Sequence, residues 1–200
     1  MKTKRSLVSI SALLSLLMLL ALAGAARAQD AHTHNAPSSE LFPAQIRQMI
    51  SDVREETAHF RNFDEIEMAG YGKFLDCFVN KNVGGMGQHY VNGDLISDGV
   101  VDPMRPEALV YAPTRGGDNI LVAFEYLILA SDWDYSKSRG QAPVLFGQKF
   151  HLKTNIPNTP PVWALHIWLW TDNPDGMFSD YNPLVFCPGN QPVTDLTPAS

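Results

Sequence analysis

Apolar and polar positions along this chain follow two different periods, and the change between them falls near Gly72. Between residues 43 and 68, the residues of one face recur at a spacing of three to four: Ile46, Met49, Ile50, Val53, Thr57 and Phe60. That spacing predicts an amphipathic helix. Pro43 suits its first turn, Asn62 marks a break, and Gly70 follows the expected end near Met68.

Beyond Gly72 the pattern becomes that of strands, separated by segments rich in Gly, Pro, Asn and Asp. The β-like runs lie near residues 87–91, 108–111, 120–130, 144–146 and 163–171. Asp118-Asn119 predicts a hairpin between the second run and the third. Because the helix precedes the strands instead of alternating with them, the sequence predicts an α+β fold: an N-terminal amphipathic helix packed on an antiparallel barrel-like β-sheet.

The first 28 residues have the composition of a signal peptide. A positive segment ends at Arg5, and the apolar run that follows is short for a bilayer span of roughly 20 residues. Ala26-Arg27-Ala28 supplies small residues for cleavage. We therefore expect a signal peptide (1–28), a flexible N-terminal segment (29–39) and a single domain (40–200) in a periplasmic or secreted protein. A transmembrane anchor is the alternative.

The charge of the chain argues against nucleic acid as a partner. The full sequence has a formal net charge of −6, and the expected cleavage removes four basic residues and no acidic ones, which brings the charge to −10. An acidic domain without a basic cluster is poorly suited to nucleic acid or to anionic lipid. The charge is compatible with a small-molecule ligand as a partner.

Cys77 and Cys187 are the two cysteines of the chain. An even count in an exported protein indicates a disulfide, and this one closes a loop of 110 residues. The chain-entropy model gives about 4–5 kcal/mol of stabilisation for such a loop. Two free thiols, or two thiolate metal ligands, are the alternatives.

Glu125 is the most informative residue, because it lies in the most apolar run of the mature chain, residues 120–130. A carboxylate among apolar side chains is costly unless it is paired, hydrogen-bonded or bound to a metal. Strand alternation places it on one face with Ala123 and Leu127. Both a structural carboxylate, held by an Arg or by backbone amides, and a functional one satisfy this pattern.

His89 and His166 lie in two other β-like runs, and with Glu125 they supply the donors of a two-histidine-one-carboxylate centre. We predict that the three converge inside the barrel-like sheet and bind a divalent transition metal: Zn, Cu, Fe or Mn. Each histidine alone is more typical of a core residue with one hydrogen bond. Weaker candidates for ligands are Glu107, His151, and the N-terminal pair His32 and His34.

The main alternative is a metal-free periplasmic protein that binds a small molecule in an aromatic pocket. Its lining would be Tyr90, Tyr126, Trp168, Trp170 and Phe178. A third hypothesis is a metal-free enzyme in which Glu125 and a nearby histidine act as acid and base. The sequence has no nucleophile-elbow, phosphate-loop or dinucleotide motif, and whether the protein is an enzyme stays open.

Seven segments, in this order and spacing, resemble a family of uncharacterised exported bacterial proteins. They are GMGQHYVN (85–92), DPMRPEALVY (102–111), VAFEY (122–126), LFGQKF (145–150), LHIWLW (165–170), NPDGMF (173–178) and NPLVFC (182–187). The resemblance covers most of the mature chain. It implies a cysteine at the position of Cys77, which supports its pairing with Cys187.

The family pattern includes the residues at His89, Glu107, Glu125 and His166. His151 departs from it, which weakens that residue as a ligand. The pattern also carries a histidine shortly before His166, where this chain has Pro161-Val162-Trp163. The resemblance implies no particular activity.

Overall fold

The structure is a computed structural model that describes residues 43–134, 136 and 138–189. The predicted signal peptide (1–28) and flexible segment (29–39), with His32 and His34, lie outside these residues. Within the described ranges, no helix has the length and the apolar character needed to cross a bilayer.

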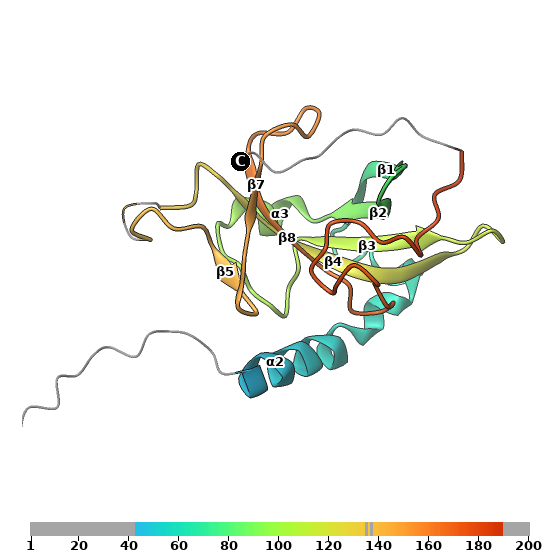
Figure 1. Ribbon diagram of the computed structural model, residues 1–200, viewed down its shortest axis with the longest axis horizontal. Coiled ribbons are helices and arrows are strands. Elements are labelled where there is room, and N and C mark those ends of the chain that lie inside the picture. Colours follow the sequence, from blue (N-terminus) through green and yellow to red (C-terminus); the bar gives the residue numbers. More distant parts are fainter. Residues whose placement is uncertain (1–42, 135, 137, 190–200) are drawn as a thin grey trace, which may run out of the picture. The chain divides into compact units, whose positions relative to one another are not determined.

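Six antiparallel strands form one curled sheet that resembles half of a barrel (Figure 1). Their order across the sheet is β1 (Gly72–Asn80), β2 (Gly84–Val91), β3 (Ala108–Pro113), β4 (Asn119–Leu129), β8 (Val162–Ile167) and β7 (His151–Lys153). A separate two-stranded sheet pairs β5 (Val144–Leu145) with β6 (Gln148–Lys149). The predicted α+β class and antiparallel sheet are confirmed, and so is the hairpin that joins β3 to β4.

The helical part is shorter and more broken than the sequence pattern predicts. The first described helix, α2, runs from Pro43 to Glu56, and two 3-10 turns follow, η1 (Ala58–Arg61) and η2 (Phe63–Glu65). The Thr57 hydroxyl donates to the Val53 carbonyl at 2.5 Å, and the Asn62 side chain caps η2 by accepting from the Asp64 amide. These local hydrogen bonds compete with a continuous helix. A short helix, α3 (Gly93–Ser97), follows β2.

One face of the sheet belongs to the largest hydrophobic cluster of the protein. Tyr126, Leu165 and Ile167 are strand residues of this cluster, and Val53 of α2 is completely buried in it. The Arg54 side chain donates to the Leu169 carbonyl at 3.1 Å. Because side chains alternate along a strand, the residues between these positions point to the other face.

A disulfide joins Cys77 of β1 to Cys187 near the C-terminal end of the described chain, as predicted. The segment before Cys187 also pairs with β2, where the amide of Gly85 donates to the Asn182 carbonyl at 3.0 Å. The Asn182 amide donates back to the Gly85 carbonyl at 2.8 Å. A covalent link and two backbone hydrogen bonds therefore hold this segment against the β1–β2 edge of the sheet.

We expect the double variant Cys77→Ser/Cys187→Ser to lose about 2–5 kcal/mol of free energy of unfolding, because the loop of 110 residues is then free in the unfolded chain. Urea unfolding of both proteins, with and without reductant, measures the loss. Reductant should destabilise the wild type by a similar amount and leave the variant unchanged. An unaltered unfolding midpoint in the variant would contradict this expectation.

Candidate functional site

The register of the sheet places His89, Glu125 and His166 on the same face. Glu125 of β4 lies directly opposite His166 of β8, and directly opposite residues of an antiparallel pair project to one side. His89 of β2 lies opposite Val110, which in turn lies opposite Ala123, two residues before Glu125. Three side chains from three strands are thereby brought to one surface.

Gly87 allows β2 to approach β3 closely just before His89. Its φ is +89°, a region that favours glycine. A Cβ at this position would lie 2.6 Å from the Cγ1 atom of Val110. The glycine therefore helps to set the position of His89 relative to β3.

Glu125 and His89 are in direct contact. The Nε2 atom of His89 lies 3.3 Å from Oε2 of Glu125, and their side chains are 3% and 12% exposed. The ring of His166 lies next to this pair, 5.9 Å from the ring of His89 between centroids and 4.7 Å from Trp168. The buried carboxylate thus has the partner that its apolar surroundings require.

Several imidazole nitrogens at this site have no hydrogen-bond partner within the described chain: Nδ1 of His89 and both ring nitrogens of His166. Burial lowers the pKa of His166 to about 4, although the charge of Glu125 acts in the opposite direction. His166 is therefore neutral at pH 7. A neutral imidazole has one nitrogen that accepts and one that donates, so this residue can still bind a proton donor, an acceptor or a metal ion.

Glu125 keeps its charge in spite of burial. Desolvation is the largest influence and raises its pKa, but the hydrogen bond from His89 and the electrostatic influence of His89, His166 and Lys153 outweigh it. The net result is a pKa below the usual value of 4.5. The site thus presents a carboxylate next to imidazoles, which can anchor a polar group, bind a cation or exchange a proton.

A cavity of about 210 Å³ opens on this face of the sheet, with Glu125 and His89 in its wall. Strands β1, β2 and β4 supply most of the wall, and the segment 156–162 closes it. The lining is mainly apolar: Phe74, Leu75, Met86, Val91, Ile96, Leu127, Leu129, Ile156, Pro160 and Val162. A concave apolar surface with a few polar groups is the usual form of a small-molecule site.

Lys153 contributes a second charge to the cavity wall, and the sequence analysis did not identify it. It is the last residue of the short strand β7, is 3% exposed, and pairs with Asp180, with 2.5 Å between Nζ and Oδ2. The alternation of His151, Leu152 and Lys153 was the available signal, but three residues make a weak pattern. A buried ammonium paired with a carboxylate adds no net charge to the cavity.

The three residues predicted to bind a metal share one face of the sheet. Among the described residues, no group of three or more His, Cys, Asp or Glu side chains is arranged to hold a metal ion. The contact of His89 with Glu125 nevertheless matches two ligands of one ion, because donors bound at about 2.0–2.1 Å in a tetrahedron lie roughly 3.3 Å apart. His166 is the residue that must turn to complete such a site.

Glu107 is a buried carboxyl group apart from these three residues. It is 1% exposed, accepts from the Leu127 amide at 3.0 Å through Oε2, and has no partner at Oε1 in the described chain. Desolvation raises its pKa to about 8, against the lowering effect of the backbone hydrogen bonds. It does not line the cavity. It lies just before β3 and accepts a hydrogen bond from a backbone amide of β4.

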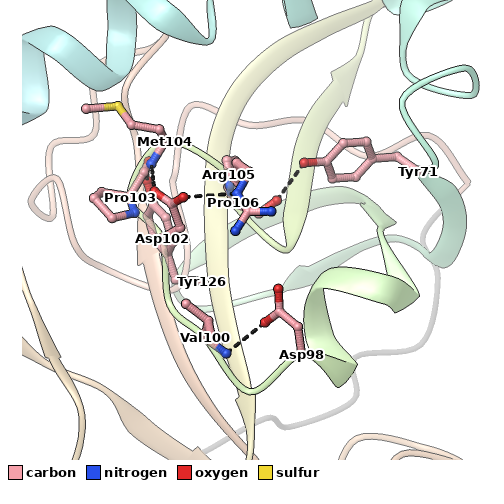
Figure 2. A network of polar contacts seen from close by, with 9 residues as sticks. All are labelled: Tyr71, Asp98, Val100, Asp102, Pro103, Met104, Arg105, Pro106 and Tyr126. Carbon is pink, nitrogen blue, oxygen red and sulfur yellow. Dashed lines mark hydrogen bonds and ion pairs between the residues drawn. The ribbon is translucent and has the colours of Figure 1, made fainter.

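The loop that leads to Glu107 is anchored by two tyrosines and an aspartate (Figure 2). The Tyr71 hydroxyl donates to the Pro106 carbonyl at 2.7 Å, and the Tyr126 hydroxyl donates to the Pro103 carbonyl at 2.8 Å. Asp102 accepts from the Met104 amide and from the Arg105 side chain, both at 2.9 Å. Residues 102–106 are thereby held in place, which positions Glu107 at the start of β3.

His151 is not part of the site. It lies on β7 opposite Ala164 of β8 and is exposed. It borders an open groove together with Asp175 and Asp180. The structure therefore gives no support to His151 as a fourth ligand of the centre.

The five residues of the predicted aromatic pocket do not line the cavity that contains Glu125. Tyr90 and Tyr126 belong to the core on the opposite face of the sheet, each next in sequence to a residue of the cavity wall. Trp168 and Trp170 border an open groove of about 720 Å³ together with Arg54. Phe178 packs against Phe146, with 6.3 Å between ring centroids.

Comparison of this chain with protein-family models, curated proteins and solved structures finds no match.

Glu107 should make the protein less stable as the pH rises. Its pKa is 4.5 in the absence of the fold and about 8 within it, so the folded state holds a proton that the unfolded state has released between these values. The free energy of unfolding therefore falls from about pH 4.5 to pH 8. Glu107→Gln stays neutral and can still accept from Leu127, and we expect it to exceed the wild type by about 1 kcal/mol or more at pH 8.

Urea unfolding of wild type and Glu107→Gln at several pH values measures this difference, and Glu55→Gln on the exposed side of α2 serves as the matched control. The gap between Glu107→Gln and wild type should widen from pH 5 to pH 8, while the control follows the wild type. Parallel pH profiles for all three proteins would show that Glu107 does not hold a proton at neutral pH.

Proposed function

We propose that this protein binds a small, largely apolar molecule in the cavity on the sheet face that carries Glu125, and that it does so without a metal. The observation that carries the proposal is the combination of an apolar cavity of about 210 Å³ with a buried His89–Glu125 pair in its wall. Apolar walls supply affinity, and a small number of fixed polar groups supply orientation.

The positions of the polar groups support a binding role. Glu125 and His89 come from central strands of the sheet, and their contact at 3.3 Å restrains both side chains. Lys153 is restrained in the same way by Asp180. Polar groups that are already held in place lose little freedom when a ligand arrives, which favours affinity.

We also propose that the protein works outside the cytoplasm, in the periplasm or as a secreted protein. The support is the disulfide between Cys77 and Cys187 together with the signal-peptide composition of residues 1–28. A small apolar ligand met in that compartment would be taken directly from the surrounding medium.

Filling the cavity should abolish binding. Ile156 lines the cavity, so Ile156→Trp places a large ring inside it; Ile120, which is 52% exposed and outside the lining, gives the matched control Ile120→Trp. We expect ethylbenzene to raise the melting temperature of the wild type and of the control, and to leave the melting temperature of Ile156→Trp unchanged. Equal responses of the two variants would place the binding elsewhere, and no response in any protein would remove the proposal.

A second candidate function is a metal centre formed by His89, Glu125 and His166. It is favoured by one observation, namely that three potential ligands share one face and that three of their ring nitrogens lack hydrogen-bond partners within the described chain. The requirement is that His166 turns toward the Glu125–His89 pair. Bound metal would act at this site as a Lewis acid.

Metal uptake by untagged protein tests the second candidate. If it holds, equilibration with Zn²⁺ followed by desalting and elemental analysis should give one ion per chain in the wild type and in the control His151→Gln. The variants His89→Gln and Glu125→Gln should lose the ion. Zinc below a tenth of an equivalent in the wild type, or equal retention by all four proteins, would exclude this centre.

A further inference from the structure

The carboxylate of Glu125 is the charged group most accessible from the cavity. Its side chain is 12% exposed, whereas those of His89 and Lys153 are each 3% exposed. All three residues line the cavity, and they are its only ionisable residues within the described lining. A ligand in the cavity therefore meets an acceptor with negative charge before it meets a cation.

The two charged side chains of the cavity wall differ in how they are compensated. Lys153 has a permanent counter-charge, because Asp180 lies 2.5 Å from its ammonium group. Within the described chain, Glu125 has direct polar contact only with an imidazole at 3.3 Å, which is a counter-charge only when it is protonated, and the more distant Lys153 is already paired with Asp180. A buried carboxylate is most stable next to a full cation, so Glu125 is the group at which a ligand gains most by bringing one.

The volume of the cavity limits the body that can accompany this cation. An apolar cavity of about 150 Å³ holds benzene, and the cavity here measures about 210 Å³. A single ring with a short substituent therefore fits. The walls that surround such a ring are aliphatic and aromatic, among them Leu75, Val91, Ile96 and Leu127.

We propose that the ligand is a protonated amine on an apolar body about the size of one ring, with its ammonium group against Glu125. This inference rests on the proposed function, because it names the class of molecule that the same cavity binds. An anion of equal size would face the carboxylate of Glu125 and would have to compete with Asp180 for Lys153. A hydrocarbon would fill the apolar part of the cavity but would leave Glu125 with the imidazole alone.

Three probes of nearly equal size test the charge preference on the wild-type protein. They are benzylamine, which is a cation at pH 7, the uncharged ethylbenzene, and the anion benzoate. Dissociation constants come from titrations monitored by NMR at pH 7 and low salt. We expect benzylamine to bind at least tenfold more tightly than ethylbenzene, and benzoate to bind more weakly than both.

The variant Glu125→Gln tests whether the preference comes from this carboxylate. It keeps the size of the side chain and removes its charge. We expect benzylamine to lose at least tenfold in affinity, while ethylbenzene changes by less than threefold. Ile120→Trp, remote from the lining, should leave both affinities unchanged. If Glu125→Gln does not fold, the order of the three probes on the wild type decides alone.

The outcomes separate this inference from the proposed function. Binding of ethylbenzene without a preference for benzylamine overturns the amine inference and leaves the apolar cavity standing. Tightest binding of benzoate overturns it in favour of Lys153 as the anchor. A preference for benzylamine that survives in Glu125→Gln assigns the preference to another group. Absence of binding by all three probes removes the proposed function together with the inference.

Discussion

The buried carboxylate of Glu125 is the constraint on which the rest of this site depends. An ionised acid on a central strand is tolerated only with compensation, and the compensation comes from the hydrogen bond of His89 at 3.3 Å and from the charge of Lys153. The register of β2, β3, β4 and β8 must therefore be correct to the residue, since a slip by one position would turn each side chain to the other face.

Because the carboxylate of Glu125 must be kept apart from the main core, the two faces of the sheet differ in composition. One face carries Tyr126, Leu165 and Ile167 into the main core, which also contains Val53 of α2. The other face carries Glu125 and His166 and is hollowed into a cavity. Stability is thus supplied mainly by one side of the sheet, which leaves the other side free to hold charges and a ligand.

Buried ionisable groups near the sheet lie in different surroundings, and this decides what each can do. Glu125 reaches the cavity and stays charged. Glu107 satisfies a strand amide and is neutral at pH 7, because burial raises its pKa to about 8. His166 is neutral for the same reason of burial, with a pKa of about 4. The two buried carboxyl groups thus have opposite charge states, because Glu125 has His89 as a hydrogen-bond partner and Glu107 has no cationic partner in the described chain that lowers its pKa.

The sequence alone determined the local features whose cause is local. Alternation along residues 120–130 put Glu125 on the face of Leu127, and the same alternation assigns Tyr126 to the opposite face, which rules it out of a pocket with Glu125. The even number of cysteines indicated the disulfide that the structure contains. Edge strand β1 escaped prediction because its first half is largely exposed and its pairing is interrupted by bulges.

Tertiary structure decided everything that depends on partners distant in the chain. That His89 meets Glu125, that Glu125 faces His166, and that Lys153 pairs with Asp180 all follow from strand order and register. No period in the sequence encodes these long-range pairings, because many strand orders satisfy the same alternation. The sequence could therefore name an acid that needs a partner, and only the packed sheet could choose the partner.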